Sequence, residues 1–356
     1  MTTIKDVSRL ANVSISTVSR VINKSANVAP EKEKAVLDAM RELNFVPNSF
    51  AQALVNRRSN CIGVLVGDLC GGPFFAQMMQ GIENEILPAN KYVIVMSGNH
   101  IHDREKNSIE ALLLRRCDAL IIHSKALSDE ELINIKNNNP DTPFVFVNRL
   151  IPSLEDYCVY VDIKEGMKNG VNHLIEKGHK SIAYIASDEF NFPDAKARMD
   201  GYKKALEQAD IPFDETLVST AYPSENGGYE AIKNLLTKNN KFSAFVAYND
   251  AMAIGAISAL TEADIQIPQQ ISAIGFDDNP MANFIKPKLT TIRYPIEEVG
   301  RRAAKLALTL LNDKNEEDSD KEGKEENQEV EKIAKEELFF IPNLIERASV
   351  ADLTKQ

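Results

Sequence analysis

The sequence has few cysteines, and their positions do not suggest a metal site or a disulfide framework. The four cysteines, at positions 61, 70, 117 and 158, lack the close paired spacing of zinc and redox motifs. Free thiols are the usual state in a reducing compartment. We therefore expect a cytoplasmic protein with no bound metal.

Long apolar runs and catalytic motifs are also missing. No stretch of about 18 apolar residues occurs, so we expect no transmembrane helix and no membrane partner. The N-terminus has no apolar segment of the kind that marks an export signal. We find no nucleophile beside a base and no glycine loop suited to phosphates. The sequence thus predicts no catalytic residues, no cofactor and no enzymatic activity.

The net charge of −11 is divided unevenly along the chain. Residues 1–60 hold nine Lys/Arg and five Asp/Glu, a net of +4, and the remainder holds 32 and 47, a net of −15. A basic start on an acidic body favours a nucleic-acid-binding head followed by a region with another task.

Residues 3–23, TIKDVSRLANVSISTVSRVIN, predict two short amphipathic helices joined by a tight turn. Thr3 and Ser14 are suited to cap them. Two such helices cannot bury a core alone, and the apolar stripe of residues 30–43 supplies a third. A helix-turn-helix on a third supporting helix is a DNA-reading arrangement.

The chain after residue 60 alternates strand-length apolar runs with helix-length amphipathic stretches. Such alternation favours parallel sheets covered on both faces, here in two halves that divide near Asp162. The expected strands are Ile62–Val66, Tyr92–Met96, Ala119–Ile122, Phe144–Val147, Tyr157–Val161, Ser181–Ile185, Ala244–Ala247 and Ile271–Phe276. The expected helices are 74–87, 103–115, 128–137, 164–177, 194–209, 226–238, 250–263 and 301–311.

Residues 313–337 differ from the rest of the body. They hold twelve acids, five lysines and no aromatic residue, a composition typical of solvated, disordered segments. We expect an acidic disordered insert; a partner-binding tail is the alternative. Residues 338–342 regain strand character, so the chain is expected to re-enter a sheet there.

Several motifs resemble the LacI/GalR family of bacterial transcription regulators. The resemblance begins at IKDVSRLANVSISTVSRVIN and NFVPNSFAQAL, and continues at IGVLVGD, HLIEKGHKSIAYI, YNDAMAIGAI, ISAIGFDD and LTTIRYPI. The segments VNRLIP and DAKARMDGY are most similar to the galactose-responsive members. The family implies a homodimeric repressor that binds a pseudo-palindromic operator and is released by a small effector, here a monosaccharide.

The resemblance also implies a domain plan. It comprises a helix-turn-helix head (1–48), a hinge helix and linker (49–60), an N-lobe (61–160 with 293–312) and a C-lobe (161–292 with 338–348), the two lobes being like a periplasmic sugar-binding protein. In the head, Arg20 is able to reach a guanine edge, whereas short polar side chains suit phosphates. Leu54 occupies the position of the family's minor-groove wedge, and a plain dimer contact is its alternative. The expected DNA contacts are Thr3, Ser14, Ile15, Ser16, Thr17, Ser19, Arg20, Asn23, Asn48 and Leu54.

The effector is expected between the lobes, outside the carboxyl ends of the strands. Carboxylate and guanidinium groups there suit the adjacent hydroxyls of a sugar. The resemblance assigns Asn148, Arg198, Asn249 and Asp277 to a polar ring, and Ile296 to an apolar wall with the aromatic residues. The expected ligand contacts are Asp68, Phe74, Phe75, Asn148, Arg149, Arg198, Asn249, Asp277 and Tyr294.

Other interpretations stay open at this stage. Asn249 also suits a helix cap, Asp277 begins a turn sequence, and Phe74 and Phe75 suit a core. Where the family commonly has an acidic or amide residue before Pro-Phe-Phe, this chain has Cys70-Gly71-Gly72, which leaves Asp68 as the nearby carboxylate. A purine co-repressor is the alternative effector, and a transport-type sugar-binding protein is the alternative function.

Overall fold

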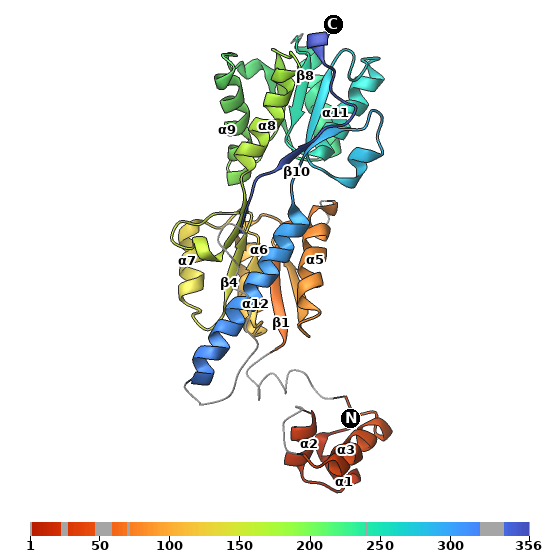
Figure 1. Cartoon of the computed structure of the whole chain (residues 1–356), viewed down its shortest axis with the longest axis vertical. Helices are drawn as coiled ribbons and strands as arrows, with labels where there is room; N and C mark the ends of the chain where they lie inside the picture. Colours follow the sequence, from red (N-terminus) through yellow and green to blue (C-terminus); the bar gives the residue numbers. More distant parts are fainter. Residues whose placement is uncertain are drawn as a thin grey trace.

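The computed structural model describes residues 2–22, 28–46, 59–69, 72–238, 241–320 and 338–355, with residues 314–320 as backbone alone. The chain forms a small helical head and a body of two lobes, with the N-lobe between the head and the C-lobe (Figure 1).

The head consists of α1 (Ile4–Leu10), α2 (Ile15–Ile22) and α3 (Pro30–Glu42). Val7, Val18 and Val36, one from each helix, are fully buried in its core. Asn12 has a φ of 51°, the left-handed conformation that asparagine tolerates in a tight turn. Ser14 caps α2, because its Oγ accepts a hydrogen bond from the Thr17 backbone N–H at 3.2 Å.

The N-lobe is a six-stranded parallel sheet in the order β11-β5-β4-β3-β1-β2. Its elements are β1 (Cys61–Val66), α5 (Pro73–Ile86), β2 (Tyr92–Ser97), α6 (His102–Leu114), β3 (Ala119–Ile122), α7 (Asp129–Asn137), β4 (Phe144–Val147), η1 (Glu155–Tyr157), β5 (Cys158–Val161), α12 (Ile296–Asp320) and β11 (Phe339–Phe340).

The C-lobe sheet has the order β12-β10-β9-β8-β6-β7, parallel except for β12. Its elements are α8 (Ile163–Glu176), β6 (Ile182–Ser187), α9 (Pro193–Gln208), η2 (Glu215–Leu217), β7 (Val218–Ala221), α10 (Glu225–Thr237), β8 (Ala244–Ala247), α11 (Asp250–Glu262), β9 (Ser272–Asp277), η3 (Pro280–Asn283), β10 (Thr290–Arg293), β12 (Asn343–Ile345) and η5 (Leu353–Lys355).

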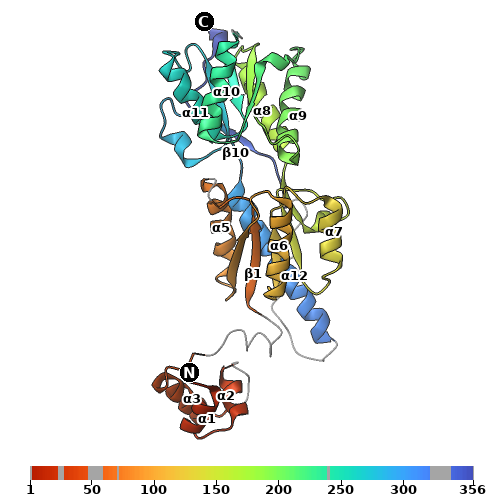
Figure 2. The same ribbon diagram turned by 180° about the vertical axis from the view of Figure 1, so that it is seen from behind.

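Both sheets are covered by helices on their two faces, as the continuous apolar strands predict (Figures 1 and 2). Helices α5 and α12 lie side by side on the N-lobe, and their close approach depends on glycine. A Cβ atom at Gly81 would overlap the Glu297 carbonyl, and one at Gly300 would overlap the Met78 carbonyl.

The chain passes between the lobes three times, from β5 to α8, from β10 to α12 and from β11 to β12. Each passage leaves or enters a strand at the facing edges of the two sheets (Figure 1). The carboxyl ends of the parallel strands therefore meet across the space between the lobes, where ligands of doubly wound sheets bind.

Two predicted boundaries are wrong. Residues 338–348 do not all join the C-lobe, because Phe339–Phe340 pairs with β5 of the N-lobe and only β12 pairs with β10. The Phe339 ring lies 5.0 Å from the Tyr160 ring, which fixes this register. Arg293 is the last residue of β10, where it lies opposite Asp277 of β9 in the C-lobe sheet. The return to the N-lobe therefore begins with α12.

The predicted disordered insert begins too early, because α12 continues through residues 313–320. No proline or glycine occurs between residues 301 and 320 to end the helix. The remaining insert, 321–337, lies outside the described residues, as do Asn23, Asn48, Leu54, most of the predicted hinge and Cys70-Gly71.

The described part of the chain contains no helix that is both long and apolar enough to cross a membrane. Within the same residues, no cluster of three or more His, Cys, Asp or Glu side chains is placed to hold a metal ion. Cys61, Cys117 and Cys158 are free thiols.

Candidate ligand cleft and DNA-binding head

A cavity of about 160 Å³ lies between the lobes at the carboxyl ends of the strands. Every ligand residue expected from the sequence lines it: Asp68, Phe74, Phe75, Asn148, Arg149, Arg198, Asn249, Asp277 and Tyr294. Ile296, which was expected on the apolar wall, is buried in the hydrophobic core.

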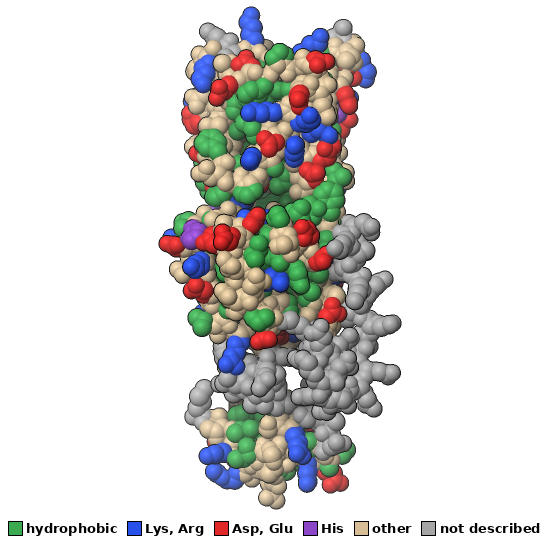
Figure 3. All heavy atoms as spheres, turned by 90° about the vertical axis from the view of Figure 1, so that its left-hand side faces the viewer, with side chains coloured by type: hydrophobic (Ala, Val, Ile, Leu, Met, Phe, Trp, Pro, Cys, Tyr) green, Lys and Arg blue, Asp and Glu red, His purple; other side chains and the backbone are tan. Residues whose placement is uncertain are grey.

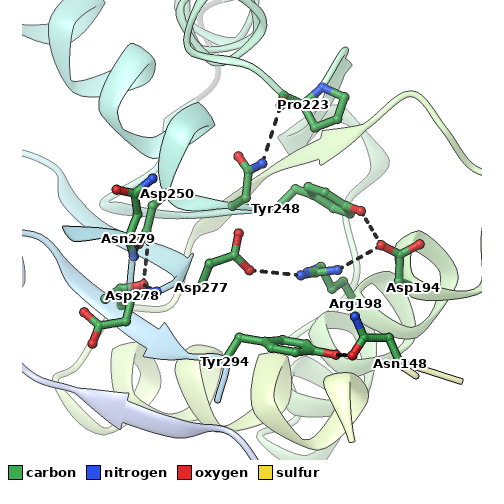
Figure 4. A network of polar contacts seen from close by, with 12 residues as sticks. Asn148, Asp194, Arg198, Pro223, Tyr248, Asp250, Asp277, Asp278, Asn279 and Tyr294 are labelled. Atoms are coloured by element: carbon green, nitrogen blue, oxygen red, sulfur yellow. Dashed lines mark hydrogen bonds and ion pairs between the residues drawn. The ribbon is translucent and has the colours of Figure 1, made fainter. Parts of the chain in front are cut away.

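Arg198 of α9 is the central cation of the cavity and is only 4% exposed. Its guanidinium lies between two carboxylates, with Nη1 3.4 Å from Asp194 Oδ2 and Nη2 3.4 Å from Asp277 Oδ1 (Figure 4). The Tyr248 and Phe276 rings each lie 4.3 Å from its Cζ atom. Charge on two sides and aromatic faces on two others hold the guanidinium plane in one orientation.

The two carboxylates beside Arg198 have pKa values displaced in opposite directions. Burial opposes ionisation of Asp194, but Lys125 and Arg198 lower its pKa. Asp277 has only the 3.4 Å contact with Arg198, and its burial raises its pKa to about 7. Asp194 has both Lys125 and Arg198 beside it, whereas Asp277 shares Arg198 with Asp194, so at Asp277 the cost of burial exceeds the attraction of the cation. The cavity wall therefore combines the ionised carboxylate of Asp194 with the Asp277 carboxyl group, which both donates and accepts near neutral pH, and Asp68 and Glu189 line the cavity as well.

The strand-end asparagines serve two purposes at once. Asn148, with a φ of 61°, accepts a hydrogen bond at 2.7 Å from the Tyr294 hydroxyl, which joins the N-lobe to the segment after β10. Asn249 Oδ1 caps α11 by accepting from the Met252 backbone N–H at 2.9 Å. The helix-cap interpretation of Asn249 is therefore confirmed, and its amide still lines the cavity.

The aromatic wall of the cavity is continuous with the core. Phe75 is 8% exposed, and Phe74 packs edge-on against both Phe75 and Tyr294 with ring centroids 5.3 Å apart. Arg149 lines the cavity, but its guanidinium is held by the N-lobe, where Nη1 donates to the Leu127 carbonyl at 2.7 Å. Arg149 thus anchors the loop after β3.

Sequence reasoning missed several residues of the cavity wall. His123 and Lys125 directly follow β3, so the strand-end rule could have identified them. Tyr248 stands between β8 and Asn249. The same rule could have identified His100, which is three residues past β2 as Lys125 is past β3, whereas Asp194 at the start of α9 carries no comparable signal. The missed lining residues are His100, His123, Ser124, Lys125, Ile163, Glu189, Pro193, Asp194, Tyr222, Pro223 and Tyr248.

Among the described residues, three buried polar atoms of the cavity wall have no hydrogen-bond partner: Asp194 Oδ1, Arg198 Nε and His123 Nδ1. His100 Nδ1 faces the buried Glu105 carboxylate, 3.8 Å from Oε1. Burial followed by the charge of Lys125 lowers the pKa of His123 to about 3, so its ring is neutral at neutral pH. Buried polar atoms are normally paired. The three unpaired atoms therefore offer a polar ligand both donors and acceptors, from both lobes.

The head presents its predicted DNA-reading residues on an exposed surface. Val18 and Val21 of α2 face the core, whereas Ser14, Ser16 and Arg20 are exposed and Ile15 is 45% exposed. Thr3 is exposed as well, whereas Thr17 and Ser19 are half-buried. Basic side chains stand out on the face of the head seen in Figure 3.

Comparisons with known proteins agree with the division into a DNA-binding head and a two-lobed body. Residues 3–48 match the family "Bacterial regulatory proteins, lacI family", and residues 171–350 match the "Periplasmic binding protein-like domain". The chain belongs to the LacI family.

Relatives of this LacI-family chain match along most of its length. It is 38% identical to the HTH-type transcriptional regulator GalR of Salmonella typhimurium LT2, over 99% of this chain and 97% of GalR. It is 40% identical to GalS of the same organism, over 86% and 89%. The lac repressor dimer bound to operator and the anti-inducer ONPF has a TM-score of 0.82 at 26% identity, covering 98% and 99%. The chain is therefore a DNA-binding transcription regulator and not an enzyme.

Proposed function

We propose that the chain is a cytoplasmic, homodimeric repressor whose heads bind a pseudo-palindromic operator and whose cleft binds a neutral sugar of galactose type. The cavity between the lobes carries this proposal, because it presents unpaired buried donors and acceptors beside an aromatic wall. The likeness to GalR and GalS supports galactose. The transcriptional regulator CelR, a solved structure 26% identical to this chain, is a complex with cellobiose, which supports a sugar as the ligand class.

The proposed mechanism couples the cleft to the head. A sugar in the cleft holds the lobes together, moves the N-lobes relative to one another in the dimer, and prevents the hinge around Leu54 from ordering on DNA. The sugar must bind the DNA-incompetent state more tightly, since equal affinity for both states would shift nothing. Linkages of this kind amount to about 1–3 kcal/mol.

A thermal-shift panel on the full-length protein tests the effector class. We expect D-galactose to raise the unfolding temperature more than D-glucose, D-ribose or cellobiose do, and hypoxanthine and guanine to have no effect. A ligand present at 100 times its Kd stabilises by about 2.7 kcal/mol. A shift with a purine alone would contradict the sugar and favour a co-repressor.

A further inference from the structure

An ion pair crosses the cleft between the lobes. Lys125 follows β3 in the N-lobe, and Asp194 lies in the first turn of α9 in the C-lobe. Lys125 Nζ is 2.8 Å from Asp194 Oδ2, and the two side chains are 19% and 15% exposed. Phe192 extends this contact, because its ring lies 5.8 Å from both Lys125 Nζ and the His100 ring.

Hydrogen bonds to α6 of the N-lobe fix the position of the loop that carries Lys125. Glu105 of α6 is fully buried, and its carboxylate accepts hydrogen bonds from Ser124 Oγ at 2.5 Å and from the Ala126 backbone N–H at 3.1 Å. A third donor, the Lys125 backbone N–H, lies at 3.3 Å. The loop that carries the ammonium group is thereby anchored to α6, so Lys125 reaches the cleft from a fixed base.

The two oxygens of Asp194 have opposite environments. Oδ2 accepts from Lys125 Nζ, from the Tyr248 hydroxyl at 2.6 Å and from Arg198 Nη1 at 3.4 Å. Oδ1 is buried and has no partner. Three donors orient this carboxylate, and Asp194 lines the cavity; the contacts from Tyr248 and Arg198 are drawn in Figure 4. An unpaired buried acceptor of this kind favours a ligand that brings a donor to it.

We propose, on the basis of the sugar-binding function above, that Asp194 and Lys125 form a recognition pair joining the lobes. Asp194 Oδ1 accepts a hydrogen bond from one hydroxyl of the sugar, and Lys125 ties the same carboxylate to the N-lobe. A sugar bound to Asp194 is thus recognised and at the same time holds the lobes together. A ligand with an anionic group, or with no hydroxyl at this position, is rejected.

Calorimetric titration of the full-length protein with D-galactose tests the pair. Asp194→Asn should weaken binding at least tenfold, because the amide oxygen is retained by Lys125, Arg198 and Tyr248 and an NH₂ group then faces the cavity. Lys125→Met should weaken binding by a similar factor, and Lys125→Arg should restore most of it. The double variant should lose much less than the product of the two single losses.

Lys204→Met is the matched control, because it removes a Lys–Glu207 pair of the same 2.8 Å distance on α9, away from the cavity. It should leave binding unchanged. Deoxygalactoses give a second readout that a purely structural role would not alter. One deoxy analogue should bind the wild type more weakly than galactose does, yet bind Asp194→Asn as well as galactose does.

Three results are distinguishable. Coupled losses in the Asp194 and Lys125 variants, with the matching deoxy analogue, support the pair. If the wild type binds galactose and the Asp194 and Lys125 variants bind it equally well, as Lys204→Met should, the recognition pair is overturned and the proposed function stands. No binding by the wild type of any sugar in the panel would overturn both.

Discussion

The head and the cleft recognise their targets by opposite physical means. In the head, the side chains expected on DNA are mostly exposed on one face of a short helix, and a few fully buried valines hold that helix in place. In the cleft, the proposed ligand contacts are largely buried and charged, with one ion pair between the lobes, one within the C-lobe and further polar atoms left unpaired. The head therefore depends on a small core, whereas the cleft depends on the exact balance of buried charge.

Breaking the core of the head should have the largest effect. Val18 is fully buried between the three helices, and Val18→Asp places a charge there at a cost of several kcal/mol, which a core of this size cannot compensate. We expect operator affinity to fall more than 100-fold while the sugar affinity stays unchanged. Fluorescence anisotropy with an operator selected by the wild-type protein measures the operator affinity, and calorimetry measures the sugar affinity. A parallel loss of sugar binding would contradict the separation of the two regions.

Removing the central cation should break the cleft alone. Arg198→Met leaves Asp277 without its ion pair and Asp194 with Lys125 as its cation, and breaking a buried pair costs about 3–5 kcal/mol. We expect sugar binding to be lost and operator binding to persist but no longer respond to sugar. Arg115→Met, at an exposed position on the N-lobe, is the control. Sugar binding that survives Arg198→Met would place the ligand elsewhere.

The raised pKa of Asp277 predicts a pH-dependent difference in stability. The folded protein keeps the Asp277 proton up to about pH 7, whereas the unfolded chain releases it near the usual value of 3.8. Stability is therefore lost as the pH rises from about 4 to 7. Asp277→Asn should match the wild type below pH 4 and exceed its unfolding free energy by up to about 4 kcal/mol at pH 8.

Unfolding of both proteins across this pH range measures the effect, and taking the difference cancels other titrating groups such as His173 and His179, whose pKa values are lowered by burial. A constant difference at every pH would mean that Asp277 is ionised throughout. The same variant should weaken sugar binding, because an amide cannot replace the carboxyl group in all its hydrogen bonds.

The exposed face of α2 should show the smallest effect. Ile15 is 45% exposed and lies outside the head core, so Ile15→Ala should change the free energy of unfolding little. An isoleucine side chain reads DNA by apolar contact, for example with a thymine methyl group, rather than by a bidentate hydrogen bond. We expect altered preference at one or two operator positions, read by selection from a randomised DNA pool. An unaltered preference would remove Ile15 from the reading face.

The two regions also differ in how far the sequence predicts them. The head is local: its turn, caps and core residues lie within 45 positions, so periodicity and capping suffice. Fully apolar strands such as β3 and β8 were predicted with their bounds. β10 was missed because it begins Thr290-Thr291, fully buried threonines whose hydroxyls are paired with Arg347 and Asp250. β7 was missed because it is a partly polar edge strand.

The cleft is assembled from distant segments, and only part of it can be predicted. Sheet topology places residues at strand ends, and Asn148, Asn249 and Asp277 were predicted to line the cavity on this basis, whereas His123 and Tyr248 were missed. The partner of Asp194 is 69 positions away, and nothing local marks that pairing. Arg149 was predicted to contact ligand by its position after β4, yet its guanidinium is bound to the Leu127 carbonyl. Sheet topology predicts where a residue lies, but the hydrogen-bond and ion-pair partners of its side chain depend on tertiary contacts.

Calorimetric titration of D-galactose into the full-length protein, alone and saturated with operator, tests the central claim that cleft and head are linked. We predict that operator weakens sugar binding 5- to 100-fold, and that sugar weakens operator binding by the same factor, because linkage between two sites is reciprocal. Equal sugar affinity in the two titrations would contradict the account.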